Sequence, residues 1–151
     1  MSNNAIICPV NGEKINENVA RIAAFIVIIF TVTAVLFKLP VLLIALGADF
    51  ALRAFTSGAY SPVKYVSKQL FRLSFLSEKI GDAAPKQFAA GIGFVFSLAI
   101  AAFQFTQYYI LANSFATVLL FCAALESFAG YCLGCTVYTY AVIPFLKNNN
   151  K

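Results

Sequence analysis

The sequence predicts an all-α integral membrane protein with four transmembrane helices and an amphipathic interfacial helix between spans two and three. Hydrophobic residues make up 61% of the 151 residues, charged residues 11%, and the mean hydropathy is +0.82. Soluble domains carry about 25% charged residues. A chain of this length holds about four spans of roughly 20 residues with short connections. We therefore expect one helical membrane domain over residues 1–151 and no separate soluble catalytic domain.

The first two spans are predicted over about 19–37 and 41–55. A Lys-Leu-Pro sequence at 38–40 ends the first span, because proline disfavours helix at the residue before it. So short a link predicts an antiparallel hairpin. The second span carries Asp49 and Arg53 at a spacing of four, which places both on one helix face. Opposite charges one turn apart in lipid predict an internal ion pair.

The segment over about 63–80 is too charged to span. Its apolar residues recur at helical spacing between lysines and arginines, which favours a helix lying in the interface against anionic lipid. A Gly-Asp-Ala-Ala-Pro sequence at 81–85 is expected to break this helix. The third span follows over about 88–111, with an Ala-Asn-Ser turn at 112–114.

The last apolar stretch, 115–145, is longer than the roughly 20 residues that one span needs. We expect a fourth span over about 115–135, a helix break between Gly130 and Gly134, and a short C-terminal segment over 136–145.

The basic residues are divided unevenly between the two sides of this topology. Lys38 lies alone on one side. The other side holds the remaining residues that flank the spans, namely Lys14, Arg21, Lys64, Lys68, Arg72, Lys79, Lys86, Lys147 and Lys151. The positive-inside rule then places both termini in the cytoplasm, in the cell (inner) membrane. This topology accounts for the net charge of +5 with the lipid bilayer as partner, and no interleaving of aromatic and basic residues indicates nucleic acid.

The chemistry concentrates in residues 125–135, where Glu126 and the pair Cys132-Leu133-Gly134-Cys135 interrupt an apolar run. Charges and thiols at such depth are costly unless they are bonded or used. A Cys-x-x-Cys pair can close a reversible disulfide, bind a soft metal ion, or pack as small apolar residues. The helix break predicts thiols at the start of the next helical segment, where a helix N-terminus favours the thiolate.

Helical rise places Asp49 and Glu126 near mid-bilayer and the cysteine pair near the cytoplasmic interface, with Cys8 ahead of the first span on the same side. These residues predict one inward-facing pocket. Its catalytic candidates are Cys132, Cys135, Cys8 and Glu126. Asp49 and Arg53 either position Glu126 or form a structural ion pair that Glu126 joins. Because the chain has no histidine, a soft metal ion would need Cys8, Cys132 and Cys135 as ligands.

Five short elements extend over nearly the whole chain. They are Cys8-Pro9 followed by Arg21, Asp49-Phe50-Ala51-Leu52-Arg53, Tyr60-Ser61-Pro62, Pro85-Lys86-Gln87-Phe88-Ala89 with Gly93, and Leu125-Glu126 leading to Cys132-Leu133-Gly134-Cys135. In these elements the chain resembles the membrane-protein family called domain of unknown function 4395. The resemblance supplies no activity. It implies that the thiols and the Asp/Arg block belong to one pattern, adds Tyr60 and Ser61 as binding or positioning residues, and suggests thioredoxin-like or sulfurtransferase partners.

The sequence thus predicts thiol-disulfide exchange or sulfur transfer near the cytoplasmic face, carried out by Cys132 and Cys135 with Cys8 as a relay to a soluble partner. A membrane quinone could accept electrons, although no sequence feature requires one. Two alternatives stay open. One is a transporter or binding protein for a soft metal ion or a small sulfur-containing anion. The other is a structural membrane protein whose basic helix docks on lipid or on a partner.

Overall fold

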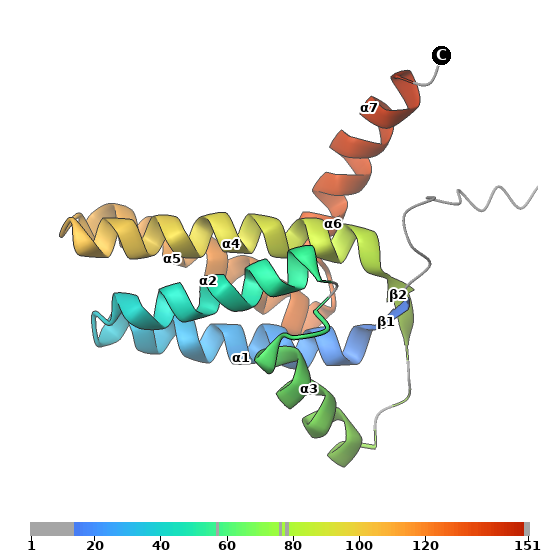
Figure 1. Cartoon of the computed structure of the whole chain (residues 1–151), viewed down its shortest axis with the longest axis horizontal. Helices are drawn as coiled ribbons and strands as arrows, with labels where there is room; N and C mark the ends of the chain where they lie inside the picture. Colours follow the sequence, from blue (N-terminus) through green and yellow to red (C-terminus); the bar gives the residue numbers. More distant parts are fainter. Residues whose placement is uncertain (1–13, 57, 76, 78, 150–151) are drawn as a thin grey trace, which may run out of the picture.

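The computed structural model describes residues 14–56, 58–75, 77 and 79–149 (Figure 1). These residues are helical apart from turns and one small two-stranded ribbon. The all-α fold class is therefore confirmed. Cys8, one of the predicted site residues, lies outside the described residues.

Four helices lie along one another and alternate in direction (Figure 1): α1 (Glu17–Leu36), α2 (Pro40–Phe55), α4 (Ala83–Phe105) and α5 (Tyr109–Ala124). The starts of α1 and α4 and the ends of α2 and α5 therefore share one end of the bundle. Three segments are long and apolar enough to cross a membrane, namely Glu17–Leu36, Ala83–Phe105 and Tyr109–Ala129. With 16 residues, α2 is shorter than these. The chain is a membrane protein with three candidate spans by length and composition.

The hairpin of α1 and α2 follows the sequence prediction. The side chain of Asn16 accepts a hydrogen bond from the backbone N–H of Asn18 at 3.1 Å and so caps α1. After α1 ends, Lys38 takes a left-handed conformation with φ 51°. Pro40 then opens α2, a position where the missing proline N–H costs no helical hydrogen bond.

Small residues bring α2 and α4 close together. A Cβ added at Gly93 of α4 would lie 2.9 Å from the Phe50 ring, and one added at Gly47 of α2 would lie 2.9 Å from the Ser97 Oγ. Small residues at such contacts allow close packing between membrane helices. The buried core beside them includes Leu43 and Ile100.

The turn after the third span lies at 106–108, so the predicted turn at 112–114 is wrong. Gln107 adopts φ 62° there, and α4 ends at Phe105 while α5 begins at Tyr109. Ser114 lies within α5, and its hydroxyl donates to the Ile110 carbonyl at 2.9 Å. Hydrogen bonds of this kind satisfy a polar side chain within a helix, which the composition of the segment does not reveal.

The amphipathic helix is shorter than predicted. Helix α3 (Pro62–Leu73) begins near the predicted residue 63, but it ends at Leu73 rather than near 80. Phe75 follows with φ 44°, in the left-handed region. The prediction that this helix extends to about residue 80 is therefore wrong.

The chain after α3 forms a strand instead of a helix break. Strand β2 (Ile80–Asp82) pairs antiparallel with β1 (Lys14–Asn16), with Ile15 opposite Gly81. Helix α4 begins directly afterwards at Ala83, so the predicted break over 81–85 and the predicted start near 88 are also corrected. The ribbon ties the start of α1 to the start of α4 (Figure 1). Local sequence does not show this pairing because its partners lie far apart in the chain.

The helix break that ends the fourth span falls at Gly130, inside the predicted region between Gly130 and Gly134. Helix α5 continues as a π-helical turn, η1 (Leu125–Ala129), and Gly130 with φ 66° ends it. The terminal segment then runs through α6 (Leu133–Val137), η2 (Tyr138–Val142) and α7 (Ile143–Asn148), and leaves the bundle at an angle (Figure 1). The predicted boundary at 135/136 is thus corrected, because the helical span ends at 129 and the terminal segment begins at 133.

Candidate functional site

The cysteine pair lies at the start of the terminal segment. Cys132 is the N-cap of α6, and its Sγ accepts a hydrogen bond from the backbone N–H of Cys135 at 3.2 Å. Both residues are free thiols and are partly buried. The Thr136 hydroxyl and amide bond to the Cys132 carbonyl at 3.2 and 3.1 Å and hold this first turn in place. A backbone N–H directed at sulfur stabilises negative charge there.

The two thiols have different acidities. The hydrogen bond from the Cys135 side chain lowers the pKa of Cys132 below its ordinary value, although burial acts in the opposite direction. The same hydrogen bond, together with burial, raises the pKa of Cys135. Lys86 favours the thiolate at both positions. Cys132 is therefore the more acidic thiol of the pair, and Cys135 is the less acidic one.

Close contact with α4 fixes the position of this first turn. A Cβ added at Gly134 would lie 2.5 Å from the Ala89 Cβ and 2.9 Å from the Ala89 Cα. Farther along, the Phe88 and Tyr138 rings lie 5.5 Å apart between centroids. The glycine of the Cys-x-x-Cys sequence therefore allows α6 to lie directly on the α4 backbone.

We expect Gly134→Ala to loosen α6. Overpacking costs about 1–3 kcal/mol, which corresponds to an increase of about 5- to 150-fold in local opening. Hydrogen exchange of the 133–137 amides in detergent measures this opening. Gly91→Ala is the matched control, because a Cβ at Gly91 meets nothing within 4 Å. Unchanged exchange in Gly134→Ala would contradict the close contact.

A pocket of about 280 Å³, which we call the polar pocket, opens beside the thiols. Its lining includes Arg21 of α1, Lys86 of α4, Cys132 and Cys135. The Arg21 Nε is buried and has no hydrogen-bond partner among the described residues. Two cations beside a thiolate suit an anionic or electron-rich ligand.

A second pocket of about 180 Å³, the apolar pocket, adjoins the polar pocket. It lies between α1, α4 and α5, and Phe50 and Arg53 of α2 contribute to its lining. The two pockets share Ala20, Lys86, Glu126 and Cys132. The Cys132 thiol therefore lies where the two pockets meet.

Glu126 of η1 lies with the thiols, as predicted. It lines both pockets, and Lys86 and Arg53 are the cations that act on its carboxylate electrostatically. Within the described part of the chain, its carboxylate makes no ion pair within 4.0 Å. Glu126 therefore acts electrostatically on Arg53 of the Asp49–Arg53 pair, and the described residues show no direct ion pair between Glu126 and Arg53. The carboxylate belongs to the cysteine pair's surroundings, because the π-helical turn places it there.

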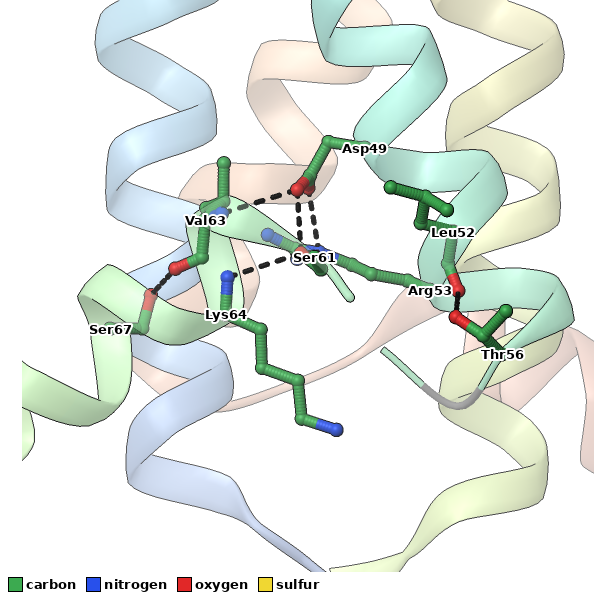
Figure 2. A network of polar contacts seen from close by, with 8 residues as sticks. All are labelled: Asp49, Leu52, Arg53, Thr56, Ser61, Val63, Lys64 and Ser67. Carbon is green, nitrogen blue, oxygen red and sulfur yellow. Dashed lines mark hydrogen bonds and ion pairs between the residues drawn. The ribbon is translucent and has the colours of Figure 1, made fainter. Parts of the chain in front are cut away.

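The predicted ion pair between Asp49 and Arg53 is confirmed, with the Arg53 Nε 2.8 Å from the Asp49 Oδ2 (Figure 2). The other carboxylate oxygen, Oδ1, accepts hydrogen bonds from the Ser61 hydroxyl at 2.5 Å and from the Val63 N–H at 3.2 Å. Ser61 in turn caps α3 by accepting from the Lys64 N–H at 3.1 Å. The buried carboxylate therefore attaches the start of α3 to α2.

The remaining predicted site residues lie elsewhere. Ser61 belongs to the Asp49 network and not to the thiol site. Tyr60 is 78% exposed and is not among the lining residues of either pocket. In the described ranges, no group of three or more His, Cys, Asp or Glu residues could hold a metal ion. The ligand set that includes Cys8 extends outside those ranges.

Sequence reasoning misses two cations of the site. From the sequence, Arg21 and Lys86 are predicted only as charges that orient the protein in the membrane, yet both line the polar pocket beside the cysteine pair. Both belong to the elements that carry the family resemblance, and Lys86 follows a proline at the start of an apolar segment. Those positions are the signal that could have identified them. Their meeting beside Cys132 depends on the packing of α6 against α4, which no single segment reveals.

The comparisons with known proteins give one family and no individual relative. No curated protein and no solved structure matches the chain. The family model described as domain of unknown function (DUF4395) matches residues 15–142. This range contains every described residue of both pockets and of the Asp49 network. The match confirms the resemblance drawn from the sequence, and the chain belongs to the DUF4395 family.

Proposed function

We propose that this chain is a four-span protein of the cell (inner) membrane that exchanges thiols and disulfides at its cytoplasmic end. One observation carries the proposal: the Cys132 sulfur lies at the N-terminus of α6, accepts the Cys135 N–H, and faces a pocket lined by Arg21 and Lys86. Helix N-termini and nearby cations are the surroundings of reactive cysteines.

The proposed topology counts α2 as the fourth crossing. Its 16 residues extend about 24 Å at 1.5 Å per residue, against a hydrocarbon core of about 30 Å. Its packing along α4 and its alternating direction support a crossing in a slightly thinned bilayer. The basic residues near the cysteine end favour the cytoplasmic side for that end. The apolar stretch Leu133–Phe145 is short for a span, which supports a cytoplasmic C-terminus.

The order of the exchange steps follows from the different acidities of the Cys132 and Cys135 thiols. The Cys132 thiolate attacks one sulfur of a partner disulfide, forms a mixed disulfide, and releases the partner's first thiolate beside Arg21 and Lys86. Cys135 then loses its proton to Glu126 and attacks the Cys132 sulfur, which closes the internal disulfide and releases the second thiolate. The reverse sequence reduces the internal disulfide with a soluble dithiol of the thioredoxin-like class. Sulfur transfer would use the same Cys132 attack on a sulfane sulfur.

The alkylation of the reduced protein tests the proposal. Because the pKa of Cys132 is lowered, its thiolate persists at lower pH, and its alkylation should reach half its maximal rate at a lower pH than that of an ordinary cysteine thiol. Cys135→Ala removes the hydrogen bond and should move this midpoint to higher pH. Cys122→Ala should leave it unchanged. Mass spectrometry of iodoacetamide adducts over a pH series measures the rates. Thiols that react with neither iodoacetamide nor glutathione disulfide would return the pair to a packing role.

One observation favours a second candidate, a binding protein for a small sulfur-containing anion. The Arg21 Nε is buried without a hydrogen-bond partner among the described residues, and it lines the polar pocket together with Lys86. This candidate requires thiosulfate binding that survives Cys132→Ala and Cys135→Ala and fails in Arg21→Gln. Thiol exchange, in contrast, should be lost in Cys132→Ala and in Cys135→Ala.

A further inference from the structure

The apolar pocket is built from small side chains deep in the bundle. Ala20, Ala23 and Ala24 of α1 face Ala90 and Gly93 of α4 across it. Large side chains at these positions would fill the space between the helices. Val118 of α5 also lines the pocket and is 49% exposed on the outer surface of the bundle. The pocket therefore reaches the face that lies against lipid.

The apolar pocket is polar at the end that lies near the cysteine pair. Arg53, Lys86, Glu126 and Cys132 line it. The Arg53 Nη2 is buried and has no hydrogen-bond partner among the described residues. A buried donor of this kind is costly unless an acceptor meets it. The pocket therefore complements a molecule that has an acceptor oxygen near Arg53 and is otherwise apolar.

The size of the pocket limits the occupant. Its volume of about 180 Å³ slightly exceeds the roughly 150 Å³ of an apolar cavity that holds one benzene molecule. One six-membered ring fits, and an attached apolar chain has to leave past Val118 into the bilayer. A phospholipid head group with its phosphate is larger and fully charged, and it would have to be desolvated beside the Glu126 carboxylate.

We propose that the apolar pocket binds the ring of a single-ring membrane quinone, and that this quinone oxidises the Cys132–Cys135 dithiol. The inference rests on the proposed thiol exchange and adds its lipid-soluble partner. Cys132 lies where the two pockets meet, so one thiol faces a water-soluble disulfide or dithiol on one side and a lipid-soluble oxidant on the other. A quinone carbonyl oxygen would accept from the Arg53 guanidinium.

The step is balanced. The dithiol loses two electrons and two protons as the S–S bond forms, and the quinone gains two electrons and two protons to become a quinol. Glu126 lines both pockets and can carry the Cys135 proton toward a quinone oxygen. A soluble dithiol then reduces the internal disulfide through the polar pocket and restores the starting state.

The experiment uses the full chain, reduced and reconstituted in liposomes without oxygen, with decylubiquinone as the probe. We expect one disulfide and one quinol per protein, measured by mass spectrometry and by the loss of quinone absorbance. Val118→Phe narrows the lipid-facing mouth and should slow this oxidation by about tenfold or more, as pocket contacts of this size usually do. Val95→Phe is the matched control, because Val95 is 61% exposed and is not among the lining residues.

Exchange with glutathione disulfide separates this inference from the proposed function. Both valine variants should retain that exchange within about twofold, because neither valine lines the polar pocket through which glutathione disulfide reaches Cys132. A dithiol that exchanges with glutathione disulfide but stays reduced with the quinone would overturn the quinone inference alone. Equal slowing by Val118→Phe and Val95→Phe would also overturn it. A dithiol inert toward both oxidants would overturn the proposed function as well.

Discussion

Cys135→Ser is expected to trap a stable mixed disulfide between Cys132 and a soluble thiol, at about one per protein. The serine hydroxyl can still donate to the Cys132 sulfur, and the backbone N–H of residue 135 remains directed at it. The attacking thiolate is therefore retained, while the second thiol that would release the partner is lost. Incubation with glutathione disulfide and intact-mass spectrometry measures the adduct. The background should carry Cys8→Ser and Cys122→Ser, so that Cys132 is the only remaining thiol.

Cys132→Ser in the same background is the matched comparison. The Cys132 sulfur, whose hydrogen bond chiefly raises the pKa of Cys135, is then gone, but burial still raises this pKa. The glutathione adduct of Cys135 should therefore form about tenfold more slowly than that of Cys132, because fewer molecules carry the Cys135 thiolate at neutral pH. Equal rates for the two single-thiol variants would contradict the assignment of Cys132 as the nucleophile.

Asp49→Ala is expected to have the largest effect on stability. It removes the ion pair to Arg53 and the acceptor for the Ser61 hydroxyl and the Val63 N–H. Breaking a buried pair by removing one partner costs about 3–5 kcal/mol, because the other charge is left uncompensated. Reversible unfolding in mixed detergent measures the loss. Ser114→Ala, whose hydroxyl bonds only within α5, should change stability by less than about 0.5 kcal/mol.

A double variant decides whether the Asp49–Arg53 pair is structural. Asp49→Ala combined with Arg53→Met removes both charges, so it should recover part of the stability that Asp49→Ala loses. If the pair only attaches α3 to α2, the alkylation rate of Cys132 should stay within about twofold of the unchanged protein in the double variant. A large loss of Cys132 reactivity at restored stability would instead place the pair in the thiol chemistry.

Some elements could be predicted because their causes are local. Apolar runs of the right length predict the helices, and Pro40 marks the turn between α1 and α2. The spacing of Asp49 and Arg53 places them on one helix face, which is enough to predict their ion pair. Gly130 breaks the last apolar run within the predicted region, because glycine adopts the left-handed conformation without a steric cost.

Other elements depend on partners that the local sequence does not contain. The strand Ile80–Asp82 forms only because Lys14–Asn16 lies beside it, and a charged amphipathic pattern there predicts a longer helix instead. The Ala-Asn-Ser sequence at 112–114 resembles a turn, yet it lies within α5, and the chain turns earlier at Gln107. The Ser114 hydroxyl bonds to the Ile110 carbonyl inside the helix, a contact that composition does not reveal.

The sequence by itself determined that the protein is an all-α membrane protein, that a thiol pair follows a helix break, and that Asp49 pairs with Arg53, because hydropathy, glycine and helical spacing act over a few residues. Only the tertiary structure decided what surrounds the thiols. Gly134 against Ala89 sets α6 on α4, and the polar pocket then holds Lys86, Arg21 and Glu126 beside Cys132. Pockets arise where several helices pack, so their lining depends on distances between segments far apart in the chain.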